Sequence, residues 1–222
     1  MNQEAVLRES ICRIGRSLFE RGYVHATAGN ISVRLPHGTG FLITPTDACL
    51  GFLQPTALAR VDAEGRQSAG EPASKTLALH RRIYAAEPQA QAVLHTHSTE
   101  LVALTLRGVW QADAVLPPIT PYFVMKVGRV PLVPYHRPGD PAVGEWVARA
   151  IGLAQAAGAP LRAVLCDRLG PIVWHQDLDR AMAALEELEE TAHLWRLARE
   201  HGPAPLSDAQ IDELRAAFGA RW

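Results

Sequence analysis

Residues 92–98 read AVLHTHS, a short apolar run followed by two histidines that stand two positions apart. The apolar run predicts a buried strand over residues 92–96. Because alternate residues of a strand share a face and lie about 6.5–7 Å apart, His95 and His97 are expected to point to the same side. Two imidazoles in this arrangement could bind one divalent ion. They could equally be a hydrogen-bonded pair at a strand end, and the spacing does not choose between these interpretations.

Helices and strands are mixed on both sides of this stretch, without strict βαβ alternation. Helices are predicted over residues 4–21, 99–106, 141–157, 178–200 and 207–218, and strands over residues 41–44, 58–61, 114–120, 129–133, 163–166 and 171–174. A further helix is expected after Ser74, a good helix cap, with residues 77–84 contributing its inner side. We therefore predict one α/β domain over residues 1–222, in which helices cover a largely antiparallel or mixed sheet.

The composition is that of an ordinary soluble globular protein. The chain has 222 residues, of which 48% are hydrophobic and 20% charged, and its net charge is −1. No basic block favours nucleic-acid binding, and the apolar runs are far shorter than the ~20 residues of a membrane helix. The first residues lack a signal-peptide core, so we expect a cytoplasmic protein with no membrane partner. Three isolated cysteines, Cys12, Cys49 and Cys166, predict neither a disulfide framework nor a zinc ribbon.

Small polar residues occupy the loops around the predicted strands. Asn30 precedes one strand, Thr46 follows another, and Ser74 and Lys75 open a helix. The free N–H groups and positive dipole of a helix N-terminus would allow Ser74 and Lys75 to hold a phosphate or a carboxylate. Taken singly, these residues also suit ordinary roles as a turn residue, a loop hydroxyl or a helix cap.

Six ordered motifs resemble the class II aldolase/adducin family over roughly residues 9–197. They are TAGNISVR, FLITPTDA, EPASKTLALHRRIYAAEP, AVLHTHS, TPYFVMKVG, and GPIV followed by EELEETAHL. LGFLQP, VLPPITPYFVMKVGR and VPYHRPGDPAV are similar to the 3-oxo-tetronate 4-phosphate decarboxylase branch of that family. The resemblance implies a three-layer α/β/α fold with a central, mostly antiparallel sheet. It also implies a carbon–carbon lyase of carbohydrate metabolism, a homotetramer with active sites near subunit contacts, and a divalent metal, most often zinc, that acts as a Lewis acid.

The resemblance assigns roles to single residues. His95 and His97 match the first two metal ligands of the family. Tyr122 falls where aldolases carry a tyrosine near the reacting end of the substrate. The positions at which the family holds the substrate phosphate are occupied here by Asn30, Thr46 and Ser74.

The family pattern breaks at two functional positions. Thr76 stands where a glutamate serves as acid/base, and threonine cannot take a proton near neutral pH. Leu169 stands where the third metal histidine is expected, and Arg168 takes the place of the asparagine before it. Leucine has no lone pair, so the inherited set of three histidines is incomplete.

Three residues could replace the missing ligand. Asp167 lies two residues before Leu169 and would complete a two-histidine-one-carboxylate set, which suits ferrous iron as well as zinc. His136 and His175 are the other candidates. Each could instead have no part in metal binding: Asp167 could pair with Arg168, and His175 could be solvated at a strand end.

Three hypotheses follow for function. The one we favour is a divergent lyase for a phosphorylated or carboxylated sugar-acid-like substrate, assisted by zinc, or by iron or manganese. The second is an inactive relative that binds an anionic ligand or a protein partner. The third is metal-free chemistry in which Lys75 or Arg168 polarises the substrate carbonyl. If Lys75, Thr76 and Arg168 line one pocket, it would attract a small anionic substrate and repel a metal, so that the metal could be absent. Arg168 could instead be an exposed turn residue.

Overall fold

The computed structural model describes residues 3–198, 200 and 202–222 and contains one eight-stranded sheet. Its strand order is β4-β3-β2-β1-β5-β8-β7-β6. The strands are β1 (Asn30–Arg34), β2 (Phe41–Ile43), β3 (Ala59–Val61), β4 (Gln67–Ala69), β5 (Ala92–His95), β6 (Leu132–Val133), β7 (Ala163–Cys166) and β8 (Gly170–His175). All neighbouring pairs are antiparallel except β6 and β7. The predicted mostly antiparallel sheet is confirmed.

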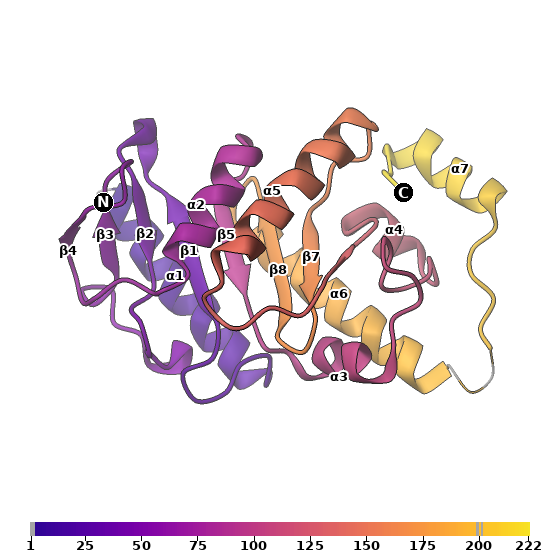
Figure 1. The fold of residues 1–222 in the computed structure, drawn as a ribbon, viewed down its shortest axis with the longest axis horizontal. Helices are drawn as coiled ribbons and strands as arrows, with labels where there is room; N and C mark the ends of the chain where they lie inside the picture. Colours follow the sequence, from indigo (N-terminus) through magenta and orange to yellow (C-terminus); the bar gives the residue numbers. More distant parts are fainter. Residues whose placement is uncertain (1–2, 199, 201) are drawn as a thin grey trace.

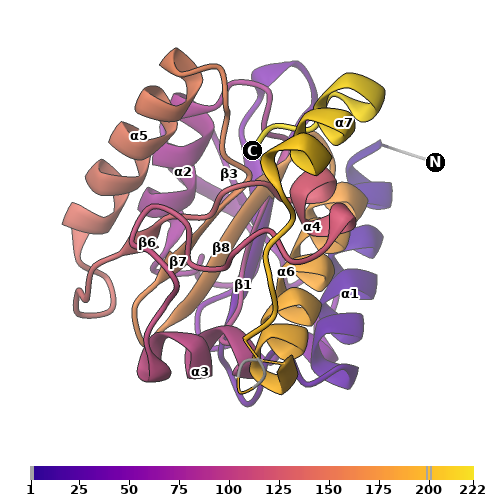
Figure 2. The same ribbon diagram turned by 90° about the vertical axis from the view of Figure 1, so that its right-hand side faces the viewer.

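Helices cover both faces of the sheet (Figures 1 and 2). They are α1 (Gln3–Glu20), α2 (Leu77–Ala86), α3 (Thr99–Arg107), α4 (Pro121–Lys126), α5 (Pro141–Ala156), α6 (Leu178–Ala198) and α7 (Asp208–Phe218). Figure 2 shows α2 and α5 on one side of the sheet, and α1, α4 and α6 on the other. The expected three-layer α/β/α architecture is confirmed. Within the described residues, no helix is both long and apolar enough to cross a membrane.

The alternation of side chains along β1 and β5 separates two apolar cores. Ile31 and Leu94 belong to the core under α1 and α6, whereas Val93 packs into the core under α2 and α5. By the same period of two, Asn30 and His95 face the α2 side. These two residues are cross-strand partners, so the start of β1 lies beside the end of β5, at one end of the two central strands.

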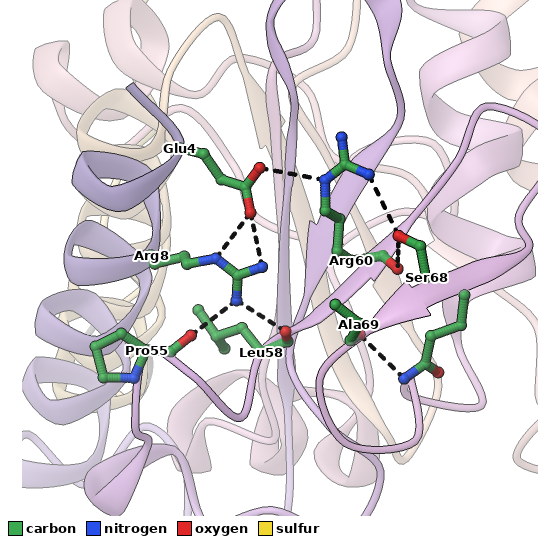
Figure 3. Close-up of polar contacts among 8 residues, drawn as sticks. Glu4, Arg8, Pro55, Leu58, Arg60, Ser68 and Ala69 are labelled. Carbon is green, nitrogen blue, oxygen red and sulfur yellow. Dashed lines mark hydrogen bonds and ion pairs between the residues drawn. The ribbon is translucent and has the colours of Figure 1, made fainter. Parts of the chain in front are cut away.

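A polar cluster ties the N-terminal helix to the sheet (Figure 3). The Arg8 guanidinium donates to Glu4 at 2.7 Å and to the carbonyl oxygens of Pro55 and Leu58 at 2.8 and 2.9 Å. Glu4 also accepts a hydrogen bond from Arg60 of β3 at 3.2 Å. The cluster therefore joins α1, the loop after residue 54 and β3.

The strand predicted over residues 114–120 and the predicted Ser74 cap are wrong, and the strand predicted over residues 129–133 is confirmed only at β6. Residues 114–120 form no strand, since consecutive prolines at 117 and 118 remove two ladder donors, and within 129–133 only β6 is extended and paired. Ser74 does not cap α2, which begins at Leu77 after Thr76. Helix α4 was not predicted, although Thr120 accepts from the Phe123 amide and a proline follows it, which is a standard helix start. The predicted end of the long helix at residue 200 runs through residue 199, which lies outside the described residues.

Candidate functional site

A cavity of about 720 Å³ lies at the end of the two central strands, where β1 starts and β5 ends. Its wall combines residues from the loops before β1 and after β2, β4, β5, β6 and β7, and from helices α2 and α5. Ten of the residues that the sequence singled out line it: Asn30, Thr46, Ser74, Lys75, Thr76, His95, His97, His136, Asp167 and Leu169. The fold thus brings together most of the residues proposed from sequence, although they are spread from residue 30 to residue 169.

The two histidines of the AVLHTHS stretch lie side by side. Their ring centroids are 5.0 Å apart. His95 donates from Nδ1 to the carbonyl oxygen of Pro171 at 2.8 Å, which leaves Nε2 as its available ring nitrogen. Gly170 permits this approach, because a Cβ at this position (φ +117°) would lie 2.2 Å from the carbonyl oxygen of Thr96.

Both imidazoles are neutral at pH 7. Burial and the neighbouring His97 lower the pKa of His95 to about 4, against the opposing effect of its bond to Pro171. Burial, and then His25, lower the pKa of His97. A neutral imidazole can offer a lone pair to a metal ion or accept a proton, so the pair keeps both abilities.

Asn30 is held in place by a hydrogen bond to His80 of α2. Its Oδ1 atom lies 2.6 Å from Nε2 of His80, and Nδ1 of His80 lies 2.7 Å from the hydroxyl of Ser32. His80 is fully buried, and burial followed by the proximity of His95 lowers its pKa to about 3. Gly29 (φ +83°) allows this loop to approach β5, since a Cβ there would lie 2.8 Å from the carbonyl oxygen of His95.

Another part of the cavity rim carries the hydroxyls of Ser74 and Thr76 and the ammonium group of Lys75. The hydroxyls of Ser74 and Thr76 lie 2.9 Å apart. The Lys75 ammonium lies 3.8 Å from the Asp47 carboxylate, and both side chains are largely exposed, so this ion pair contributes little to stability. The ammonium is therefore free to exchange Asp47 for an anionic ligand.

A third metal ligand is not in place beside His95 and His97. Leu169 lines the cavity, and so do Asp167 and His136, but His136 lies 3.5 Å from the Asp140 carboxylate. Among the residues that the structure describes, no three histidine, cysteine or acidic side chains are close enough together to hold an ion. The donor set of the described site therefore fits two ligands of a divalent metal and not the usual three.

Three sequence candidates lie away from this cavity. Arg168 is an exposed turn residue with φ +60°, and its amide donates to Thr105 at 3.0 Å. Tyr122 lies on α4 and is 62% exposed. His175 ends β8 and pairs with Ala92, which is the opposite end of β5 from His95.

Sequence reasoning missed charged residues that also line the cavity. Arg82 forms an ion pair with Glu145 of α5, and Arg137 lies in the loop that precedes α5. The helical spacing from Lys75 through Leu79 to Arg82 could have indicated Arg82 as a member of the same face. Arg137 has no such periodic signal, because it lies in an irregular loop.

Comparisons with known proteins match nearly the whole chain. The family model described as Class II Aldolase and Adducin N-terminal domain covers residues 9–196. The 3-oxo-tetronate 4-phosphate decarboxylase of Cupriavidus necator (strain ATCC 17699 / H16) is 57% identical over 226 residues and covers 100% of both chains. The protein of the same name from Escherichia coli (strain K12) is 41% identical over 213 residues, with 96% of this chain and 97% of the relative covered. The solved structure of YgbL from Escherichia coli matches with a TM-score of 0.88 and 40% identity, over 96% of this chain and 99% of that one.

Proposed function

Because the chain belongs to the class II aldolase and adducin family, we propose that it is a carbon–carbon lyase that decarboxylates a phosphorylated 3-oxo sugar acid. The name of its 57%-identical relative supplies the substrate class, 3-oxo-tetronate 4-phosphate. One observation carries the proposal to this chain. A single cavity holds anion-binding groups on one rim and a pair of neutral imidazoles on another.

The chemistry of a 3-oxo acid explains what such a cavity has to do. Cleavage of the bond between C1 and C2 releases carbon dioxide, and the electron pair moves onto the oxygen of the C3 carbonyl. The resulting enediolate then takes a proton at C2. A positive group or a hydrogen-bond donor beside the C3 oxygen stabilises the charge that develops there. In this proposal the Lys75 ammonium, or an N–H of His97, occupies that place.

The substrate phosphate is assigned to the rim that carries the hydroxyl and ammonium groups. Thr46 and Ser74 offer hydroxyls and Lys75 offers an ammonium there, and Asn30, on β1 beside His95, offers an amide from the adjoining wall. A phosphate dianion accepts several such donors at once, and a charged donor adds the largest share. The four-carbon length of a tetronate then places the carboxylate end away from this rim.

Enzymes of this family are typically dependent on a divalent metal. His95 and His97 would provide two ligands for zinc, or for iron or manganese, and Asp167 is the remaining candidate for a third. We assign no step to a metal, because Leu169 provides no ligand and the third position is not assembled. A homotetramer and a cytoplasmic location belong to the same proposal, and Tyr122 would then act from a neighbouring subunit.

A direct activity assay tests the reaction. The purified chain is mixed with 3-oxo-tetronate 4-phosphate, alone and with Zn²⁺, Mn²⁺ or Fe²⁺, and carbon dioxide release is measured. We expect turnover that His97→Ala lowers at least tenfold, whereas His175→Ala, outside the cavity, leaves it within twofold. Absence of turnover under every metal condition would refute the proposal.

One observation favours a second candidate, a relative that binds an anion without catalysis. Thr76 and Leu169 both replace residues that the family uses for chemistry, while the anion-binding rim is kept. This candidate predicts that the chain binds inorganic phosphate and shows no turnover with any metal. Turnover of the tetronate substrate excludes it.

A further inference from the structure

Four polar side chains form a row from the core to the wall of the cavity. The Tyr84 hydroxyl lies 2.8 Å from the Ser32 hydroxyl, which lies 2.7 Å from Nδ1 of His80. Nε2 of His80 then lies 2.6 Å from Oδ1 of Asn30. The first three side chains are at most 2% exposed, and only Asn30 lines the cavity. We call these four residues the buried polar row.

The direction of the hydrogen bonds follows from the buried end of the row. Within the described residues, Ser32 is the side-chain partner of the Tyr84 hydroxyl, and the backbone of Val93 contacts the hydroxyl as a donor. A buried phenol has to donate its hydrogen somewhere, so it donates to the Ser32 oxygen. Ser32 is then the acceptor in that bond, and its own hydrogen points to Nδ1 of His80.

This direction fixes the tautomer of His80. Nδ1 accepts from Ser32, so it carries no hydrogen, and the neutral ring carries its hydrogen on Nε2. Nε2–H therefore donates to Asn30, whose contacting atom has to be the carbonyl oxygen Oδ1. The amide NH2 group of Asn30 is left without a protein partner among the described residues, and it faces the cavity.

We propose that His80 is a positioning residue that holds the Asn30 amide so that only its N–H donors face the cavity, which makes this wall selective for an anion. The inference rests on the proposed function in one respect, namely that Asn30 meets the substrate phosphate. It goes beyond that function by assigning a role to a residue that touches no substrate. The buried polar row also explains why α2 carries two buried polar side chains, His80 and Tyr84, four residues apart on its inner face.

The alternative orientation of Asn30 shows why the tautomer matters. With Nδ1 protonated, the row would run in reverse, and the Asn30 carbonyl oxygen would face the cavity. A carbonyl oxygen repels a phosphate dianion, and Nδ2 would be spent on His80. The loss of one charge-assisted donor and the gain of one repulsive acceptor together predict at least about tenfold weaker phosphate binding.

A double-mutant cycle tests the coupling, with inorganic phosphate as the ligand and calorimetry as the measurement. Asn30→Ala and His80→Leu are each expected to weaken phosphate binding about tenfold. The double variant is expected to be no weaker than Asn30→Ala alone, since His80 acts through Asn30. Ile83→Val is the matched control, because Ile83 is fully buried on α2 and outside the row. It should leave phosphate affinity unchanged.

Two results would overturn the inference. One is a His80→Leu variant that binds phosphate as the wild type does, and the other is a double variant about a hundredfold weaker, which would mean independent effects.

If His80→Leu does not fold, Ser32→Ala and nitrogen NMR of the wild-type imidazole replace it. We expect the His80 signal of an Nε2-protonated ring and a weakened phosphate affinity in Ser32→Ala. An Nδ1-protonated ring would refute the proposal. If phosphate binding by the variants matches these expectations but the wild type shows no turnover, the proposed reaction is refuted and this inference stands.

Discussion

The Nδ1 atom of His95 donates a hydrogen bond to the carbonyl oxygen of Pro171, 2.8 Å away. The donor and the acceptor lie on neighbouring strands, β5 and β8, and the turn before Pro171 carries Leu169. The imidazole is therefore oriented by the strand that follows the turn of Leu169. A ligating histidine commonly donates its other N–H in this way, so the contact leaves Nε2 of His95 available as a ligand.

Restoring the two altered positions should restore metal binding. We expect the Leu169→His, Thr76→Glu double variant, purified without added metal, to contain close to one zinc per chain. The wild type should contain clearly less, because two histidines bind more weakly than three ligands. Elemental mass spectrometry of both proteins measures this difference. A Leu169→Asn variant is the control for a polar residue of similar size.

A wild type with one bound zinc per chain would contradict this expectation. It would mean that Asp167 or His136 moves to complete the site, and Asp167→Asn would then lower the metal content.

Lys75 provides a prediction that separates electrostatic catalysis from metal catalysis. Lys75→Met removes the ammonium at the rim of the cavity, and we expect kcat/KM to fall about 10²–10³-fold with the metal content unchanged. Lys126 is the only other lysine of the sequence and lies on α4, so Lys126→Met is the matched control and should stay near wild type. Steady-state kinetics and elemental analysis are measured on the same samples. Activity retained in Lys75→Met would remove this residue from the mechanism.

The part of the site that was predicted from sequence depends on strand periodicity and local motifs. The apolar run correctly predicts the strand that ends at His95, although His97 lies beyond the end of β5, and the small residues before β1 indicate the loop of Asn30. Thr120 and Pro121 contained the start signal of α4, which the apolar residues before it obscured. Those apolar residues are buried in a segment without regular secondary structure, and their sequence resembles that of a buried strand.

Other features depend on tertiary contacts that no local pattern encodes. Arg168 is an exposed turn residue with φ +60°, which is the alternative that the sequence offered, but its exclusion from the cavity depends on the surrounding fold. Asp167, one residue earlier, lies in the cavity wall. The ion pair of Arg82 and Glu145 requires the packing of α2 against α5, which the sequence alone does not give.

Stability should fall as the pH is lowered because of His80. Its pKa is about 3 in the folded protein, owing to burial and then to His95, against 6.5 when exposed. Below pH 6.5 the unfolded chain therefore binds a proton that the folded protein does not, so this contribution is complete above pH 6.5 and is lost towards pH 3. The expected loss from pH 7 to pH 5 is about 2 kcal/mol of unfolding free energy for this group.

Urea unfolding with a chelator present measures this dependence. His95, whose folded pKa is about 4, contributes with the same sign, whereas burial raises the pKa of the adjacent Tyr84, which does not titrate in this range. His80→Gln cannot take up a proton, so its unfolding free energy should depend less steeply on pH between pH 7 and pH 5 than that of the wild type. A His80→Gln variant with the same slope as the wild type would show that His80 is not the source.

The cluster at the N-terminal helix predicts that two arginines of α1 differ strongly in their effect on stability (Figure 3). The Arg8 side chain is 15% exposed and bonds to Glu4, Pro55 and Leu58, so Arg8→Ala leaves two carbonyl oxygens and a carboxylate short of donors. We expect a loss of about 2 kcal/mol. The Arg13 side chain is 62% exposed and pairs with an exposed Asp179, so Arg13→Ala should cost less than about 0.5 kcal/mol. Urea denaturation of both variants measures the difference, and equal losses would mean that Arg8 acts only as a surface charge.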